Sequence, residues 1–195
     1  MFLQAAQALL RLHPFARFTI VGDGPLRSPL EALAVRLRIS WAVDFIGWVS
    51  AQDLPSVLAG LDIVVNPSLR AWSETFCIAN IEALSMELPL VTFAVGGIGE
   101  YIEDPSINMN NISTNTDSDP QQMQLFSVGG NGVVAHTATP GAIAHAVDHL
   151  ILHPQLRRKL GEAGRRTVLA DFTTSRQMQQ YIDLYLHLFH QKNRK

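Results

Sequence analysis

Short runs of apolar and β-branched residues recur along the chain, each bounded by glycine, proline, asparagine or aspartate. These runs predict buried strands at 18–21, 43–47, 63–65, 90–94 and 130–135. Between them, apolar residues recur every three or four positions and predict helices over 2–12, 29–37, 51–61, 139–152, 155–170 and 174–191. A further helix is expected to begin near Thr75 or Phe76. Because strands alternate with helices, we expect an α/β fold with a single Rossmann-like, doubly wound parallel sheet.

One segment breaks this alternation. Residues 104–128 are rich in Asn, Ser, Asp, Gln and Thr and show little hydrophobic periodicity. A segment of this composition cannot bury enough apolar area to offset the entropy lost on ordering. We interpret it as a mobile surface insertion within one domain that covers residues 1–195.

The composition limits the classes of protein to which the chain can belong. The chain has 195 residues, of which 47% are hydrophobic, and a net charge of -2, which fits one globular domain and gives no indication of a nucleic-acid partner. No apolar run approaches the length of a membrane span. The single cysteine excludes an internal disulfide and suits a reducing compartment, so we expect a cytoplasmic protein.

The helix expected in the middle of the chain carries the most informative chemistry. If it begins as predicted, the backbone N–H groups of Phe76, Cys77 and Ile78 are among its first, unpaired donors, and with the helix dipole they favour an anion. Two carboxylates bracket these amides, Glu74 before the helix and Glu82 one to two turns into it. A carboxylate on a helix otherwise suited to burial usually has a specific hydrogen-bonding role. Glu74 could instead be only a carboxylate at a helix start, where the helix dipole favours a negative charge.

The spacing of these residues resembles that of a known family. Glu74 and Glu82 are separated by seven residues, and Phe76 follows the first of them by two positions, which is similar to the donor-sugar signature of glycosyltransferase family 4, retaining enzymes with the GT-B fold. The resemblance implies that Glu82 binds the ribose hydroxyls of a nucleotide-diphosphate sugar. It also implies that the backbone from Thr75 to Ile78 holds the phosphates and that Glu74 faces the transferred sugar, as the catalytic residue.

Three further segments match the family in the same order along the chain. Residues 21–25 read Val-Gly-Asp-Gly-Pro, 45–47 read Phe-Ile-Gly, and 96–100 read Gly-Gly-Ile-Gly-Glu. The resemblance adds Gly22, Ile46 and Gly97 to the donor-binding residues, with the backbone of Ile46 against the nucleotide base. An alternative interpretation is that Ile46 and Trp48 only cap a core.

The resemblance implies the donor half of a retaining glycosyltransferase. Such a protein transfers the sugar of a UDP-, GDP- or ADP-sugar to an acceptor, and no metal or other cofactor is expected. Residues 1–195 leave no room for the amino-terminal acceptor domain of a GT-B enzyme, and no Arg and Lys that would pair with the donor diphosphate precede Arg11. Glu87 also stands where the family usually has glycine. The second hypothesis is therefore an inactive nucleotide-sugar-binding or scaffold module, with a separate chain supplying the acceptor domain.

The sequence supports three other functions less well. The turn after residue 21 lacks the third glycine of a dinucleotide fingerprint, which disfavours an NAD-linked oxidoreductase. His145, His149 and His153 repeat every four residues and could bind a metal, but no carboxylate completes the set and a solvated helix face explains them better. Cys77 could be a reactive thiol at a helix amino terminus, but a small side chain beside the phosphates is the favoured interpretation.

Overall fold

The computed structural model of the chain describes residues 1–69, 74–93, 95–103 and 125–192. Its helices are α1 (Phe2–Leu12), α2 (Arg27–Arg36), α3 (Leu54–Leu58), α4 (Ile78–Ser85), α5 (Pro140–Leu152), α6 (Pro154–Asp171) and α7 (Thr174–Lys192), with short 3-10 helices η1 (Ser40–Ala42) and η2 (Gly96–Glu100). Its strands are β1 (Phe18–Val21), β2 (Val43–Gly47), β3 (Val64–Asn66), β4 (Leu90–Phe93), β5 (Phe126–Val128) and β6 (Val133–Ala135). The predicted alternation of strands and helices is confirmed, although α3 is shorter than the helix expected over 51–61.

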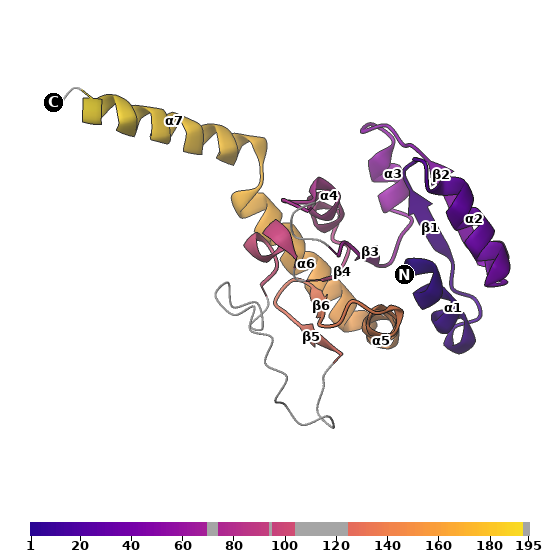
Figure 1. The fold of residues 1–195 in the computed structure, drawn as a ribbon. Helices are drawn as coiled ribbons and strands as arrows, with labels where there is room; N and C mark the ends of the chain where they lie inside the picture. Colours follow the sequence, from indigo (N-terminus) through magenta and orange to yellow (C-terminus); the bar gives the residue numbers. More distant parts are fainter. Residues whose placement is uncertain (70–73, 94, 104–124, 193–195) are drawn as a thin grey trace.

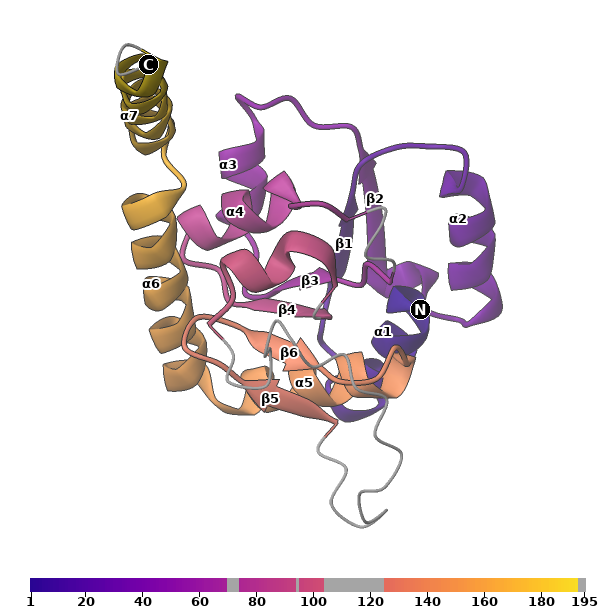
Figure 2. The same ribbon diagram turned by 60° about the vertical axis from the view of Figure 1, so that its left-hand side comes forward.

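The strands form two hydrogen-bonded sheets. β1 and β2 form a parallel pair, and the other sheet has four strands in the order β3, β4, β6, β5. Within the described residues, β1 is paired only with β2, and β3 only with β4. The predicted α/β fold is confirmed, but the backbone ladder is interrupted between β1 and β3, so the sheet is not continuous (Figure 2).

The end of the expected insertion is ordered. Phe126–Val128 form β5, which pairs antiparallel with β6. The prediction of a structureless segment is wrong for these three residues, because their polar neighbours hide a strand whose backbone pairs with the exposed edge of β6. Residues 104–124 lie outside the described part of the chain.

Alternate side chains of the four-stranded sheet belong to different layers of the core. Val91 and Phe93 of β4 pack in a cluster that includes residues of α1 and α5. Leu90 packs instead with Leu84 of α4 and Val168 of α6. Because successive residues of a strand point to opposite faces, α1 and α5 cover one face and α4 and α6 the other, as expected for a doubly wound sheet.

Two glycines of α6 allow this helix to approach α4 closely. A Cβ atom at Gly161 would lie 1.9 Å from the carbonyl oxygen of Glu87, and one at Gly164 would lie 2.5 Å from Cδ2 of Leu84. Glu87 ends the turn after α4 with φ of 60°, in the left-handed region that favours glycine. The residue that departs from the resembled family therefore occupies a position where glycine has the lower backbone strain.

The last helix, α7, extends away from the remainder of the molecule next to the end of α6 (Figure 1). None of its described side chains is buried. Its exposed apolar residues are Met178, Tyr181, Ile182, Leu184, Tyr185, Leu186, Leu188 and Phe189. No helix in the described ranges is long and apolar enough to cross a membrane.

Candidate functional site

The amino end of α4 lies later in the chain than predicted. The helix begins at Ile78 and not near Thr75 or Phe76. The reason is Cys77, whose φ of 58° and ψ of 82° place it in the left-handed region and interrupt the helical backbone just before Ile78. The amides of Phe76 and Cys77 therefore belong to the loop that enters the helix, and that of Ile78 to its first turn.

The side chains of this entry loop point to different surroundings. Those of Thr75 and Ile78 are exposed. The ring of Phe76 packs against Tyr101 and Phe172, with ring centroids 5.4 and 5.5 Å apart. Phe76 therefore anchors the loop in the core, while the backbone on either side of it stays near the surface.

The thiol of Cys77 lies against the end of β3. Asn66 donates from Nδ2 to the Cys77 Sγ at 3.1 Å. Burial raises the pKa of the Cys77 thiol, and the Glu74 carboxylate raises it further, although the backbone N–H of Asn80 acts in the opposite direction. Because the net shift is upward, it disfavours the alternative of a thiol activated by the helix amino terminus.

A buried polar network behind α4 was missed by the sequence reasoning. Asn80 is 1% exposed, and its Nδ2 donates to the Tyr101 hydroxyl at 2.8 Å, while its Oδ1 accepts from Asn66 Nδ2 at 3.1 Å. Burial raises the pKa of Tyr101. The network joins the end of β3, the first turn of α4 and the end of η2. The only signal for it in the sequence is an asparagine within a mainly apolar helix.

Glu74 is held at the mouth of α4 by its neighbours. Ser68 donates from Oγ to Glu74 Oε2 at 2.6 Å, and the N–H of Gly97 donates to the Glu74 carbonyl oxygen at 3.4 Å. A Cβ atom at Gly97 would lie 2.0 Å from the carbonyl oxygen of Thr75. Only glycine lets η2 approach this loop so closely, and the role of Gly97 toward a donor stays a prediction.

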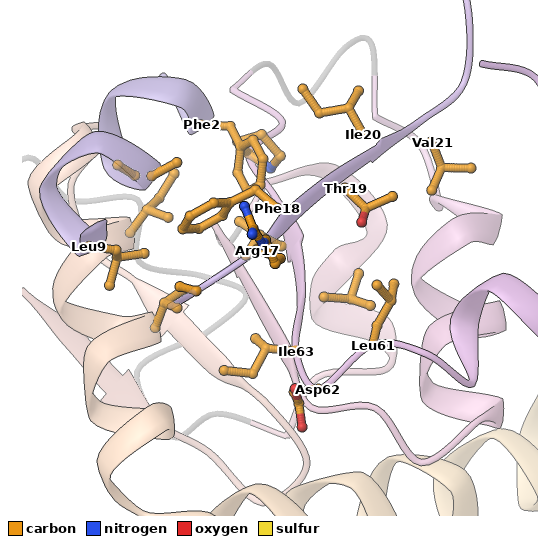
Figure 3. A pocket seen from close by; sticks show the side chains of 18 of the residues that line it. Phe2, Leu9, Arg17, Phe18, Thr19, Ile20, Val21, Leu61, Asp62 and Ile63 are labelled. Atoms are coloured by element: carbon orange, nitrogen blue, oxygen red, sulfur yellow. The ribbon is translucent and has the colours of Figure 1, made fainter. Parts of the chain in front are cut away.

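Glu82 and Gly22 lie in a groove of ≈ 1240 Å³ that is lined mainly by α1, β1, β3 and α5 (Figure 3). Glu82 is half-buried, and among the described residues its carboxylate has no hydrogen-bonding partner. Pro67 lines the same groove, while its neighbours Asn66 and Ser68 bind Cys77 and Glu74 respectively. The groove therefore adjoins the mouth of α4, and the two predicted carboxylates lie on either side of the first turn.

Ile46 lies on β2 and, unlike Trp48, does not line the groove. Its side chain is 41% exposed and that of Trp48 is 76% exposed, so neither caps a core, and that alternative is wrong. The Gly22 N–H donates to the Gly47 carbonyl oxygen at 2.7 Å. This bond holds the backbone next to Ile46 beside the end of β1.

The histidine stripe of α5 does not form a ligand set. The rings of His149 and His153 stack with centroids 4.3 Å apart, and His153 Nδ1 lies 2.7 Å from the His149 carbonyl oxygen. Across the ranges that the structure describes, no group of three or more His, Cys, Asp or Glu residues is placed to hold a metal ion.

The chain is similar in sequence to known glycosyltransferases. The profile of the family described as glycosyl transferases group 1 matches residues 1–167. The chain is 27% identical to the alpha-D-kanosaminyltransferase of Streptomyces kanamyceticus over 184 residues, which are 94% of this chain and 41% of that protein. It is 27% identical to the glycogen synthase of Mycobacterium tuberculosis over 168 residues, which are 86% of this chain and 34% of that protein. The chain thus spans less than half the length of these relatives.

Solved structures share the fold. Sucrose-phosphate synthase from Thermosynechococcus elongatus aligns with a TM-score of 0.72 at 22% identity, over 97% of this chain and 42% of its own. The Anabaena protein HepE, solved in complex with UDP, aligns with a TM-score of 0.73 at 19% identity, over 95% of this chain and 44% of its own. These neighbours have the GT-B fold. The profile match over residues 1–167 shows that the chain belongs to the group 1 glycosyltransferase family.

Proposed function

We propose that this chain is the donor half of a retaining glycosyltransferase of family 4 and that it binds a nucleotide-diphosphate sugar across the amino end of α4. The observation that carries the proposal is the placement of Glu74 and Glu82 on either side of the first turn of this helix. Helix amides attract a diphosphate, and a carboxylate on each side can accept hydrogen bonds from hydroxyls.

The two carboxylates take different roles in this proposal. Glu82, whose carboxylate has no partner among the described residues, accepts hydrogen bonds from the ribose hydroxyls. Glu74, fixed by Ser68, orients the transferred sugar. The backbone from Thr75 to Ile78 holds the phosphates and stabilises the departing diphosphate, so the reaction is proposed to need neither a metal nor another cofactor.

The glycines and the base-side strand complete the proposed site. Gly22 and Gly97 let the backbone come close to the donor, and the backbone of Ile46 lies against the base. A UDP-sugar is favoured over a GDP- or ADP-sugar, because relatives of this fold were solved with UDP. The chain spans 41% of the length of the Streptomyces kanamyceticus kanosaminyltransferase, so we propose that the acceptor binds to a separate amino-terminal domain. We also propose that the protein acts in the cytoplasm.

Isothermal titration calorimetry with UDP, GDP and ADP tests donor binding. At least one of the three nucleotides is expected to bind, and Glu82→Ala is expected to weaken its binding by about tenfold or more, because charge-assisted hydrogen bonds to the ribose are lost. Glu162→Ala, which removes an exposed carboxylate of α6, is the matched control and should leave the affinity unchanged. Equal nucleotide affinities of the parent chain and Glu82→Ala, or no binding by any nucleotide at millimolar concentration, would contradict the proposal.

The second candidate is a nucleotide-sugar-binding module without activity of its own. The partial coverage of the relatives favours it, since a GT-B active site lies between two domains. Incubation with radiolabelled sugar nucleotides separates the two functions. Release or transfer of the labelled sugar supports an active donor half, whereas binding without turnover supports the silent module.

A further inference from the structure

The groove beside β1 has a tryptophan at its carboxyl end. Its lining includes residues that directly follow three strands, namely Gly22 after β1, Trp48 after β2 and Pro67 after β3. Figure 3 labels Arg17, which precedes β1, and Val21, which ends it, so the carboxyl end of the groove is the end beside Val21. Ligands of α/β proteins bind outside the carboxyl ends of the strands. Trp48 therefore lies where a ligand is expected.

The indole ring of Trp48 is not part of the core. The residue is 76% exposed, and among the described residues its ring has no aromatic partner and its Nε1 has no hydrogen-bonding partner. Trp41, the other tryptophan in the described ranges, has the Arg17 guanidinium 5.3 Å from its ring centroid. A large aromatic ring that is left in water keeps an apolar face on which a flat ligand can stack. The face of Trp48 is thus available to a second ring.

The backbone that carries Trp48 is fixed by hydrogen bonds. The carbonyl oxygen of Gly47 accepts a backbone hydrogen bond of 2.7 Å from the turn after β1. Arg27 donates from Nη2 to the Phe45 carbonyl oxygen at 2.9 Å and from Nη1 to Asp23 Oδ2 at 3.1 Å, so it joins β2 to the same turn. Because these bonds already hold the end of β2, little conformational entropy is lost there when a ligand stacks on the indole.

We propose that Trp48 is the residue on which the base of the bound nucleotide stacks, an inference that rests on the proposed function. Glu82 lies in the same groove and takes the ribose in that proposal, and the base is bonded directly to the ribose. The backbone of Ile46, two positions before Trp48, meets the edge of the base, whereas the indole covers its face. Since every base has a flat π-face, Trp48 adds affinity whichever base is bound, and the contacts to the edge select among bases.

Calorimetry with three variants tests the proposal. UDP, GDP and ADP are titrated into the parent chain and into each variant. Because base stacking contributes strongly to affinity, Trp48→Leu should bind each nucleotide that the parent binds at least about tenfold more weakly. Trp48→Phe keeps an aromatic ring and should stay within about threefold of the parent. Trp41→Leu, which removes an exposed tryptophan outside the groove, is the matched control and should leave the affinity unchanged.

A second ligand separates stacking from a structural role of Trp48. Dihydrouridine diphosphate, in which the double bond of the uracil ring is reduced, keeps the hydrogen-bonding edge of the base but loses its aromatic face. The parent chain should bind UDP about tenfold more tightly than dihydrouridine diphosphate, and Trp48→Leu should bind the two ligands equally. A residue that only supports the fold would change both affinities by the same factor and leave their ratio at the parent value.

The possible outcomes separate this inference from the proposed function. Equal nucleotide affinities of the parent and Trp48→Leu, or a preference for UDP over dihydrouridine diphosphate that this variant retains, overturn the stacking role and leave the proposed donor site standing. No binding of any of the three nucleotides to the parent overturns both. If only GDP or ADP binds, the affinities of Trp48→Leu and Trp48→Phe decide. Should Trp48→Leu fail to fold, equal affinities of the parent for UDP and dihydrouridine diphosphate still overturn the proposal.

Discussion

At the scale of single residues, the buried polar groups behind α4 hold the candidate site in place. Asn80 has both ends of its amide paired, one with Asn66 and the other with Tyr101. A buried amide that loses one partner costs roughly 1–3 kcal/mol. The position of the α4 amino end relative to β3 and η2 therefore depends on three side chains, none of which is predicted to touch the donor.

The raised pKa of the Tyr101 phenol, caused mainly by burial, predicts a loss of stability in alkali. The unfolded chain releases this proton near its ordinary value of about 10, before the folded chain does, so the folded state binds more protons and the free energy of unfolding falls as pH rises above that value. Tyr101→Phe should flatten this alkaline decline in urea titrations. At neutral pH the variant should be roughly 1–3 kcal/mol less stable, because Asn80 loses its acceptor.

Tyr185→Phe provides the control, because this tyrosine is 68% exposed on α7. It should reproduce the alkaline decline of the parent chain. The same decline in Tyr101→Phe as in the parent would mean that the phenol is not what links stability to pH. The raised pKa of the Cys77 thiol contributes in the same direction in every variant, so the comparison isolates the tyrosine.

At the scale of secondary structure, the close contact between α4 and α6 depends on Gly161 and Gly164, which have no side chain. Gly161→Ala should destabilise the chain by several kcal/mol, although alanine favours helices, because its Cβ would overlap the Glu87 carbonyl oxygen. Gly141→Ala in the first turn of α5 meets no atom nearer than 4.0 Å and should be neutral or slightly stabilising. Thermal unfolding of both variants checks the pair, and equal effects would show that helix propensity outweighs the close contact.

The elements themselves were predictable from the sequence, because apolar runs and helical periodicity follow burial. Thr139 caps α5 at the start of the helix predicted over 139–152, accepting from the Ala142 N–H at 3.2 Å. The start of α4 was not predictable, since helix patterns do not reveal that Cys77 adopts a left-handed conformation. β5 was also missed, because a short strand gains its stability from a distant partner and carries little local signal.

The candidate site was predictable only in its outline. The sequence placed both Glu74 and Glu82 beside one helix start, because Glu74 precedes the expected helix and Glu82 lies within it. Ser68, which binds Glu74, and Asn66 and Tyr101, which bind Asn80, come from other elements, and these contacts arise only when the chain is folded. The roles of the predicted site residues toward a donor stay predictions.

At the scale of the whole molecule, α7 adds an exposed apolar surface and little packing. A chain that ends after Thr173 should melt within about 4 °C of the full chain, because no described α7 residue is buried. It should also associate less at high concentration, since a large exposed apolar patch promotes self-association. Differential scanning calorimetry and light scattering measure the two effects.

The control is the double variant Tyr181→Gln/Tyr185→Gln of the full chain, because it keeps α7 and changes only its exposed surface. These substitutions remove two of the exposed apolar side chains and should also reduce association. A large drop in the melting temperature on truncation would contradict the expectation and would mean that α7 supports the folded body.

The interrupted ladder between β1 and β3 also governs how the chain loses its structure. Residues 2–47 meet the remainder through side chains, chiefly where α1 packs on α5, and no strand pairing among the described residues crosses the boundary. Strand pairing is what usually makes a sheet melt as one cooperative unit, and without it the two halves can open separately. The free energies of unfolding expected for the Tyr101 and Gly161 variants therefore refer to the half that holds α4, and residues 2–47 are expected to unfold with a midpoint of their own.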